Sequence, residues 1–176
     1  MTAEDKPCIA ISSCLLGNLV RYDGKQKGMP ELYQHMQQYF NLLAVCPEVE
    51  MGLSVPRPAV QLTGNPQHPQ MMGRDNETID VTHEINNFCN TRPQTLKHIC
   101  GYIFKSKSPS CGLRNIPVFQ NGKIIQHNNR GLFAEAMIKH NPDLPVADET
   151  ELNTVDNRNH FIQQGLNYIK QHADLF

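Results

Sequence analysis

The 176-residue sequence contains no apolar stretch long enough to cross a membrane, because none approaches the roughly 18 residues that a spanning helix requires. Its first six residues are acidic and polar, whereas a secretory signal peptide is basic and then apolar. We therefore expect a cytoplasmic protein without membrane contact, whose cysteines stay reduced unless they bind a metal. The length is typical of one domain, and we expect residues 1–176 to form one.

The sequence also lacks an excess of charge and several local metal or redox motifs. Sixteen basic and 17 acidic side chains give a formal net charge of −1, so the molecule has no overall attraction to nucleic acid. No His-x-x-x-His motif occurs, and His68, His83 and His98 lie in unrelated segments, which disfavours a histidine-based zinc site. A thiol redox enzyme needs a resolving cysteine near a low-pKa thiolate, and no Cys-x-x-Cys motif occurs.

The chain does contain three cysteines, Cys14, Cys46 and Cys111, that each follow an apolar run and open a turn with glycine or proline. The runs are residues 9–11, 42–45 and 102–104. Such short runs are typical of buried strands, and ligands of parallel sheets gather beyond the carboxyl ends of the strands. We therefore expect the three thiols to converge on a metal or iron-sulfur site, where a set of three soft ligands leaves one position open.

A different interpretation of any one of these thiols is that it only packs in the core, because free cysteine is among the most buried residue types. The spacing of the three cysteines does little to distinguish metal ligands from core residues, because they lie far apart in the sequence and form no local metal-binding motif. The other cysteines are expected in the core: Cys8 begins the first strand, Cys89 shares a helix face with Ile85, and Cys100 precedes the third strand.

The remaining pattern predicts strands that alternate with helices. Helices are expected at about 30–40, from 80 or 82 onward with a break or kink at Pro93, at 131–140, and at about 156–172. A weak fourth strand at 144–147 contains Pro145, which confines it to a sheet edge or a strand start. This alternation favours an α/β fold, a single Rossmann-like domain with a mostly parallel sheet flanked by helices.

Two segments interrupt this alternation. Residues 47–78 contain five prolines and three glycines, which leaves no room for a long regular element. Loops of this length in a compact domain are usually functional or disordered. Further along, Asn121-Gly122 predicts a two-residue hairpin turn, which we interpret as part of a small insertion.

Charged residues near the cysteines are candidates for the chemistry. Glu48 follows Cys46 by two positions, where its carboxylate is suited to hold or deliver a proton. The alternative is that Glu48, like Glu50, is a solvated loop charge. Surface arginines and aspartates are usually only solvated, but those on the turns are candidate substrate contacts. Together with two serines they form the candidate substrate-binding set Ser13, Arg21, Asp23, Arg57 and Ser110.

The turn that leads to Cys111 alternates serines with Lys105, Lys107 and Pro109. Its hydroxyls and backbone amides are suited to an anion or to the polar edge of a small ring, and the lysines add positive charge. The alternative is that Ser-Pro simply ends the strand and Gly112 supplies a positive φ angle. Both interpretations are compatible.

Three separated blocks combine these residues. They are Ser12-x-Cys14-Leu15-Leu16-Gly17 running on to Val20-Arg21-Tyr22-Asp23-Gly24, Cys46-Pro47-Glu48 followed by Gly52-Leu53-x-x-Pro56-Arg57, and Lys107-Ser108-Pro109-Ser110-Cys111-Gly112. In content and order they resemble the thiouracil desulfidase family, and the resemblance spans Cys8 to about Glu151. It implies a single Rossmann-like domain and an oxygen-sensitive 4Fe-4S cluster that three cysteines hold, with one iron left open.

The resemblance also implies a role for individual residues. By position the cluster ligands are Cys14, Cys46 and Cys111, the acid/base residue is Glu48, and the catalytic serine is Ser108, with Ser110 as the alternative. The implied activity is the removal of sulfur from 2-thiouracil or 4-thiouracil, or from their nucleosides or nucleotides. The products are uracil and sulfide, formed by C–S cleavage without net electron transfer.

Other substrates and functions stay open. Gly112-Leu113-Arg114 and residues 131–136 look more like the desulfidase branch that carries an extra C-terminal domain and acts on 4-thiouridine in tRNA. We expect no companion domain, and the charge is near neutral, so tRNA is not favoured as the main substrate. The most serious rival function is a sensing or binding protein that holds a cluster or metal on the same cysteines without turnover. Such a protein has no use for Glu48.

Overall fold

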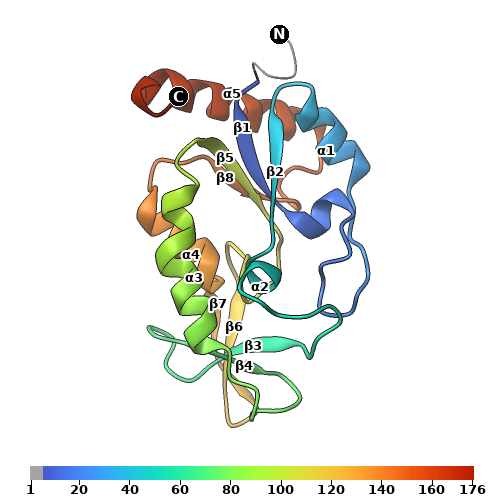
Figure 1. Ribbon diagram of the computed structural model, residues 1–176, viewed down its shortest axis with the longest axis vertical. Coiled ribbons are helices and arrows are strands. Elements are labelled where there is room, and N and C mark those ends of the chain that lie inside the picture. The colour runs from blue at the N-terminus through green and yellow to red at the C-terminus, as the bar shows by residue number, and fades with distance from the viewer. Residues whose placement is uncertain (1–5) are drawn as a thin grey trace.

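A computed structural model of the chain describes residues 6–176. Residues 1–5, on which much of the argument against a signal peptide rests, lie outside the described residues. Two four-stranded sheets and five α-helices organise the described part of the chain (Figure 1). No helix in this part combines the length and the apolar character that crossing a bilayer requires.

The first sheet, sheet A, is parallel throughout and has the strand order β2-β1-β5-β8. Its strands are β1 (Cys8–Ser12), β2 (Asn41–Val45), β5 (Ile99–Phe104) and β8 (Val146–Asp148). Every residue of β5 is buried, as expected for a central strand covered on both faces. The prediction of a Rossmann-like α/β fold is confirmed, and β8 lies at the sheet edge directly after Pro145.

Helices cover both faces of sheet A. Gly101 of β5 faces Phe161 of α5 (Val155–Gln171), whereas the neighbouring Tyr102 meets the ring of Phe133 in α4 (Leu132–His140) at a centroid distance of 6.2 Å. Because successive side chains of a strand point to opposite faces, α5 and α4 lie on opposite sides of the sheet. In Figure 1, α1 (Pro30–Gln37) accompanies α5, and α3 (Thr82–Thr95) accompanies α4.

The second sheet, sheet B, corrects the interpretation of the hairpin as a small insertion. Asn121 and Gly122 have positive φ angles and join β6 (Ile116–Gln120) to β7 (Lys123–Asn129), which confirms the predicted hairpin. However, β6 also pairs in parallel with β3 (Val60–Thr63), which pairs with β4 (Gln70–Gly73) in the order β4-β3-β6-β7. The proline-rich segment 47–78 therefore contributes two of the four strands of sheet B. The sequence pattern did not predict them because both strands are short.

Helix α3 corrects a second expectation. The helix does not break at Pro93 but continues to Thr95, two residues beyond it. Pro93 has no N–H to donate to the preceding turn, and the helix ends soon after it. Strand β5 begins at Ile99, three positions before the apolar run 102–104 that predicted it. The other predicted helices agree with α1, α4 and α5 to within a few residues.

The two sheets have separate apolar cores. The larger core surrounds sheet A, and the smaller one joins Leu62 and Met71 of sheet B to Ile85 of α3. Cys89 packs against both cores, so α3 links the two sheets. The three cysteines expected in the core do pack against apolar clusters, with Cys100 fully buried and Cys8 and Cys89 half-buried.

Replacement of Phe133 by alanine is expected to lower the free energy of unfolding by about 3–5 kcal/mol. The ring is fully buried and contacts Phe88 of α3 and Tyr102 of β5. Urea denaturation monitored by circular dichroism measures the change. The control is Phe176→Ala, which removes a ring that is 46% exposed and is expected to cost about 0.5 kcal/mol or less. Equal effects of the two substitutions would contradict the assignment of Phe133 to the core.

Candidate metal centre

The carboxyl ends of β1, β2 and β5 meet beside a cavity of about 550 Å³. Cys14, Cys46 and Cys111 all line it, each from a different connection. Cys14 lies in the short 3-10 helix Ser13–Leu16, Cys46 precedes α2 (Pro47–Glu50), and Cys111 follows the Ser-Pro-Ser turn. The parallel sheet thus brings three cysteines that are distant in sequence to one place.

The three thiols are shielded from water and protonated when they bind nothing. Cys14 and Cys111 are buried and Cys46 is half-buried, and none forms a disulfide. Burial raises the pKa of Cys14 to about 11 and raises the pKa of Cys46 and Cys111 as well, since a thiolate is poorly solvated there. A metal bound to these sulfurs would displace their protons.

The carboxylate of Glu48 is held from two sides. Arg57 donates two hydrogen bonds to Oε2, from Nε at 2.9 Å and from Nη2 at 2.7 Å, and Ser110 donates its hydroxyl to Oε1 at 2.9 Å. Only 12% of the Glu48 side chain and 6% of the Arg57 side chain are exposed. Glu48 is therefore not the solvated loop charge of the alternative interpretation.

Glu50, by contrast, acts on the backbone of the site. Its Oε1 accepts the N–H of Cys46 at 3.0 Å, and its Oε2 accepts a hydrogen bond from Arg92 of α3 at 2.8 Å. This contact caps the start of α2 and fastens the turn that carries Cys46 to the neighbouring helix. Glu50 is exposed, as expected, but it lies in α2 and its carboxylate accepts two hydrogen bonds.

Ser108 and Ser110 take different positions in the third turn. Oγ of Ser108 accepts the backbone N–H groups of Ser110 and Cys111, at 3.2 and 3.0 Å, and Ser108 lines the cavity. Ser110 is buried behind it, with its hydroxyl on Glu48. Because the oxygen of Ser108 accepts two hydrogen bonds, its own proton is left to donate to a group in the cavity.

The glycine in this turn has a different purpose from the one expected. Lys107, not Gly112, has the positive φ angle, at 59°. Gly112 is required for space, because a Cβ atom there would lie 2.1 Å from Cδ1 of Ile116 and 2.8 Å from the carbonyl oxygen of Ser108. The close approach keeps the turn folded against β6 and so holds Cys111 at the cavity.

Of the other predicted substrate contacts, some line the cavity and one does not. Ser13 and Arg21 line the cavity, and Oγ of Ser13 accepts a hydrogen bond from the side chain of Asn18 at 2.8 Å. Asp23 is outside the lining and pairs with Arg21 at 3.0 Å. The hydrogen bond from Arg21 lowers the pKa of Asp23 to about 2, which keeps this carboxylate ionised. Asp23 therefore acts by orienting Arg21.

Two residues that the sequence did not single out as a pair, Lys105 and Glu149, also line the cavity. Lys105 directly follows β5, and Glu149 directly follows β8. The two side chains form an ion pair. The same two residues border a second cavity of about 740 Å³. In the sequence, only its position just after a predicted strand could have marked Glu149 as a site residue, and that strand is short and weakly apolar.

Comparison with known proteins agrees with this arrangement. Models of protein families match residues 9–149 to the family described as 2-thiouracil desulfurase. The chain belongs to the 2-thiouracil desulfurase family. It is also similar to a solved structure described as the [4Fe-4S]-dependent thiouracil desulfidase TudS, with 29% identity and a TM-score of 0.62 over 84% of this chain and 93% of that chain. No curated protein matches.

Three soft thiols line the cavity, and thiolates are the ligands that hold 4Fe-4S clusters. Among residues 6–176, no group of three histidine, cysteine, aspartate or glutamate side chains is arranged to hold a single metal ion. Three thiolates on a 4Fe-4S cluster bind three different irons, so their sulfurs surround a larger group. The cavity lining also carries six basic side chains and two carboxylates, an excess of positive charge that suits ionised thiols.

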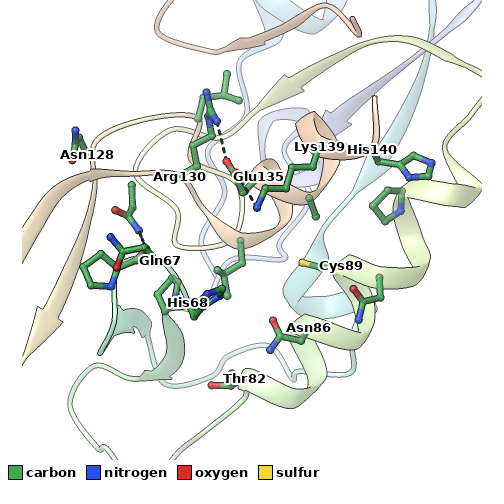
Figure 2. Close-up of a pocket in the computed structure, with 18 residues that line it drawn as sticks. Gln67, His68, Thr82, Asn86, Cys89, Asn128, Arg130, Glu135, Lys139 and His140 are labelled. Carbon is green, nitrogen blue, oxygen red and sulfur yellow. Dashed lines mark hydrogen bonds and ion pairs between the residues drawn. The ribbon is translucent and has the colours of Figure 1, made fainter. Parts of the chain in front are cut away.

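A larger cavity of the desulfurase, of about 990 Å³, lies between α3, α4 and the end of β7 (Figure 2). Its charges pair with one another, since Glu135 contacts Arg130 at 2.9 Å and Lys139 at 3.3 Å. Cys89 is the one cysteine in its lining, and none of the predicted site residues reaches it. Size therefore does not identify the site; the convergence of the three thiols with Glu48 does.

Removal of the Arg57 guanidinium is expected to destabilise the desulfurase because it leaves Glu48 buried without its cation. Arg57→Met should lower the free energy of unfolding by about 3 kcal/mol, and a second change, Glu48→Gln, should restore much of the loss. Chemical denaturation of the parent, both single variants and the double variant measures the coupling. Additive effects of the two substitutions would contradict the buried pair.

Proposed function

We propose that this protein removes sulfur from thiolated pyrimidines, 2-thiouracil or 4-thiouracil or their nucleosides or nucleotides, and yields uracil and sulfide without net electron transfer. The proposed cofactor is a 4Fe-4S cluster held by Cys14, Cys46 and Cys111, with one iron left open. The observation that carries the proposal is the convergence of three thiols from three strand ends on one cavity that also contains Glu48. The family membership and the similarity to a 4Fe-4S-dependent desulfidase support it.

Bound in this cavity, the open iron would act as a Lewis acid on the soft thiocarbonyl sulfur and make its carbon easier for water to attack. The task of the protein is then to supply and remove protons. Glu48 is the proposed proton carrier, because Arg57 occupies Oε2 with two hydrogen bonds and leaves Oε1 to exchange a proton. Ser110, which donates to Oε1, orients this oxygen.

Ser108 is the proposed catalytic serine. Its oxygen accepts two backbone N–H groups and its proton is left for the cavity, so it is placed to orient a ring or a water molecule. Ser110 is the alternative, but its hydroxyl is committed to Glu48 and lies behind the cavity wall. Ser13, Arg21 and Arg57 are proposed to contact the substrate or the groups that hold it, and Asp23 to orient Arg21.

The proposal takes residues 1–176 as one cytoplasmic desulfidase domain that acts on a small molecule. tRNA is the less favoured substrate, because the formal net charge of −1 provides no general attraction to a polyanion. The cavity of about 550 Å³ is of the size that small-molecule sites have, which supports a free base, nucleoside or nucleotide.

The ligand set is tested by single substitutions. Cys14→Ala, Cys46→Ala and Cys111→Ala are each expected to abolish cluster retention after anaerobic reconstitution, because each removes a sulfur ligand. Cys8→Ala, Cys89→Ala and Cys100→Ala are the matched controls and should retain the cluster, since these thiols pack against apolar residues. Iron and acid-labile sulfide analysis with a visible spectrum provides the measurement. Full cluster occupancy in Cys111→Ala would move the third ligand elsewhere.

Turnover separates an enzyme from a sensing protein. The reconstituted protein is expected to release sulfide from 2-thiouracil or 4-thiouracil with no added reductant, and Glu48→Gln should slow this release by about 10²-fold or more. Sulfide release under anaerobic conditions is the measurement, with cluster content determined on the same samples.

The control for this test is Glu77→Gln, which neutralises an exposed carboxylate outside the cavity and should leave the rate unchanged. Parent-like sulfide release by Glu48→Gln would remove Glu48 from the mechanism. A need for an electron donor in every turnover would instead contradict the hydrolytic chemistry and favour a redox reaction.

A further inference from the structure

Lys105 and Glu149 come together because of the register of sheet A. Phe104 of β5 pairs with Asp148 of β8 in parallel, so the next residue on each strand leaves the sheet at the same level. The backbone N–H of Lys105 donates to Oγ of Ser12 at 2.9 Å, which ties this end of β5 to the end of β1. The position of Lys105 is therefore set by three neighbouring strands.

The ion pair between these residues is well enclosed and closely held. The side chains of Lys105 and Glu149 are 17% and 10% exposed. Ser106 donates two hydrogen bonds to Glu149, from its backbone N–H to Oε2 at 2.7 Å and from its hydroxyl to Oε1 at 2.6 Å. Nζ of Lys105 also donates to the carbonyl oxygen of Ser106 at 3.0 Å. Glu149 thus has its hydrogen bonds satisfied and serves as an anchor for the ammonium group.

The anchored ammonium shares the cavity with the three cysteines. Ser12, which accepts the N–H of Lys105, ends β1 and leads directly into the 3-10 helix that carries Cys14. The same serine hydrogen-bonds Cys111. The segment that positions Lys105 is therefore tied to the segments that carry two of the three cysteines.

We propose that Lys105, held by Glu149, carries a fixed positive charge that raises the reduction potential of the cluster bound in this cavity. The inference rests on the proposed function. Hydrogen bonds to ligand sulfurs, burial and net charge near a cluster set its potential, and an enclosed charge is weakly screened. Reduction adds negative charge to the cluster, and a nearby ammonium stabilises that charge.

The decisive substitution is Lys105→Met, which removes the charge and keeps both a similar length of side chain and the backbone N–H that binds Ser12. The reduction potential of the reconstituted cluster, measured by anaerobic titration followed by its visible and electron paramagnetic resonance spectra, is expected to shift to more negative values. Lys107→Met is the matched control. It removes a charge of the same sign from the same turn, but Lys107 is exposed and should have a clearly smaller effect.

Glu149 provides a test with the opposite sign. Glu149→Gln removes a negative charge from the same cavity, so the potential should shift to more positive values. Lys105→Arg keeps the charge and should stay close to the parent. Because Lys105→Met leaves Glu149 buried without a cation and could impair folding, the double variant Lys105→Met/Glu149→Gln compared with Glu149→Gln isolates the same lysine charge without that defect.

The outcomes separate this inference from the proposed function. A parent protein that assembles no cluster contradicts the proposed function itself. A parent that assembles the cluster, combined with equal potentials for Lys105→Met and Lys107→Met, overturns the role of Lys105 and leaves the function intact. A downward shift for Lys105→Met, an upward shift for Glu149→Gln and a parent-like potential for Lys105→Arg together support the inference.

Discussion

The parallel alignment of β1, β2 and β5 is the constraint on which the site depends. Ser12 pairs with Val45, and Ile11 pairs with both Ala44 and Ile103, so the three strands end at the same edge of the sheet. Parallel strands cannot be joined by tight turns, and each connection must return across the sheet. The chain uses two of these long connections to build sheet B, since β3, β4 and α3 lie between β2 and β5, and β6, β7 and α4 lie between β5 and β8.

Buried charges around the cysteines are arranged in pairs that come from different elements. Arg57 on the proline-rich segment reaches Glu48 in the first turn of α2, and Lys105 after β5 reaches Glu149 after β8. Buried ion pairs contribute little net stability because both partners lose their hydration. The two apolar cores stabilise the fold, and the pairs hold charge in a fixed position beside the thiols. A fixed charge is what acid/base chemistry and control of a metal site require.

Local pattern was a good guide to sheet A and a poor one to sheet B. Strands β1, β2 and β5 come from apolar runs bounded by turn residues, so each is visible by itself, whereas the short edge strand β8 was only weakly indicated. The pairing of Leu62 with Val118 joins short strands that are distant in sequence, and only packing against Ile85 and Met71 makes it favourable. The sequence also left open a break or a kink at Pro93, and α3 continues two residues beyond it.

The sequence alone determined which residues are the candidates for the chemistry: the cysteines after three apolar runs, the glutamate two positions beyond Cys46 and the serines before Cys111. Residue type and position relative to a strand end are local properties. The tertiary structure decided how these residues are held. Arg57 became the partner of Glu48, Ser110 moved behind the cavity wall, and Glu149 came to anchor Lys105. Each of these contacts joins segments that only the register of the sheet and the path of the long connections bring within hydrogen-bonding distance.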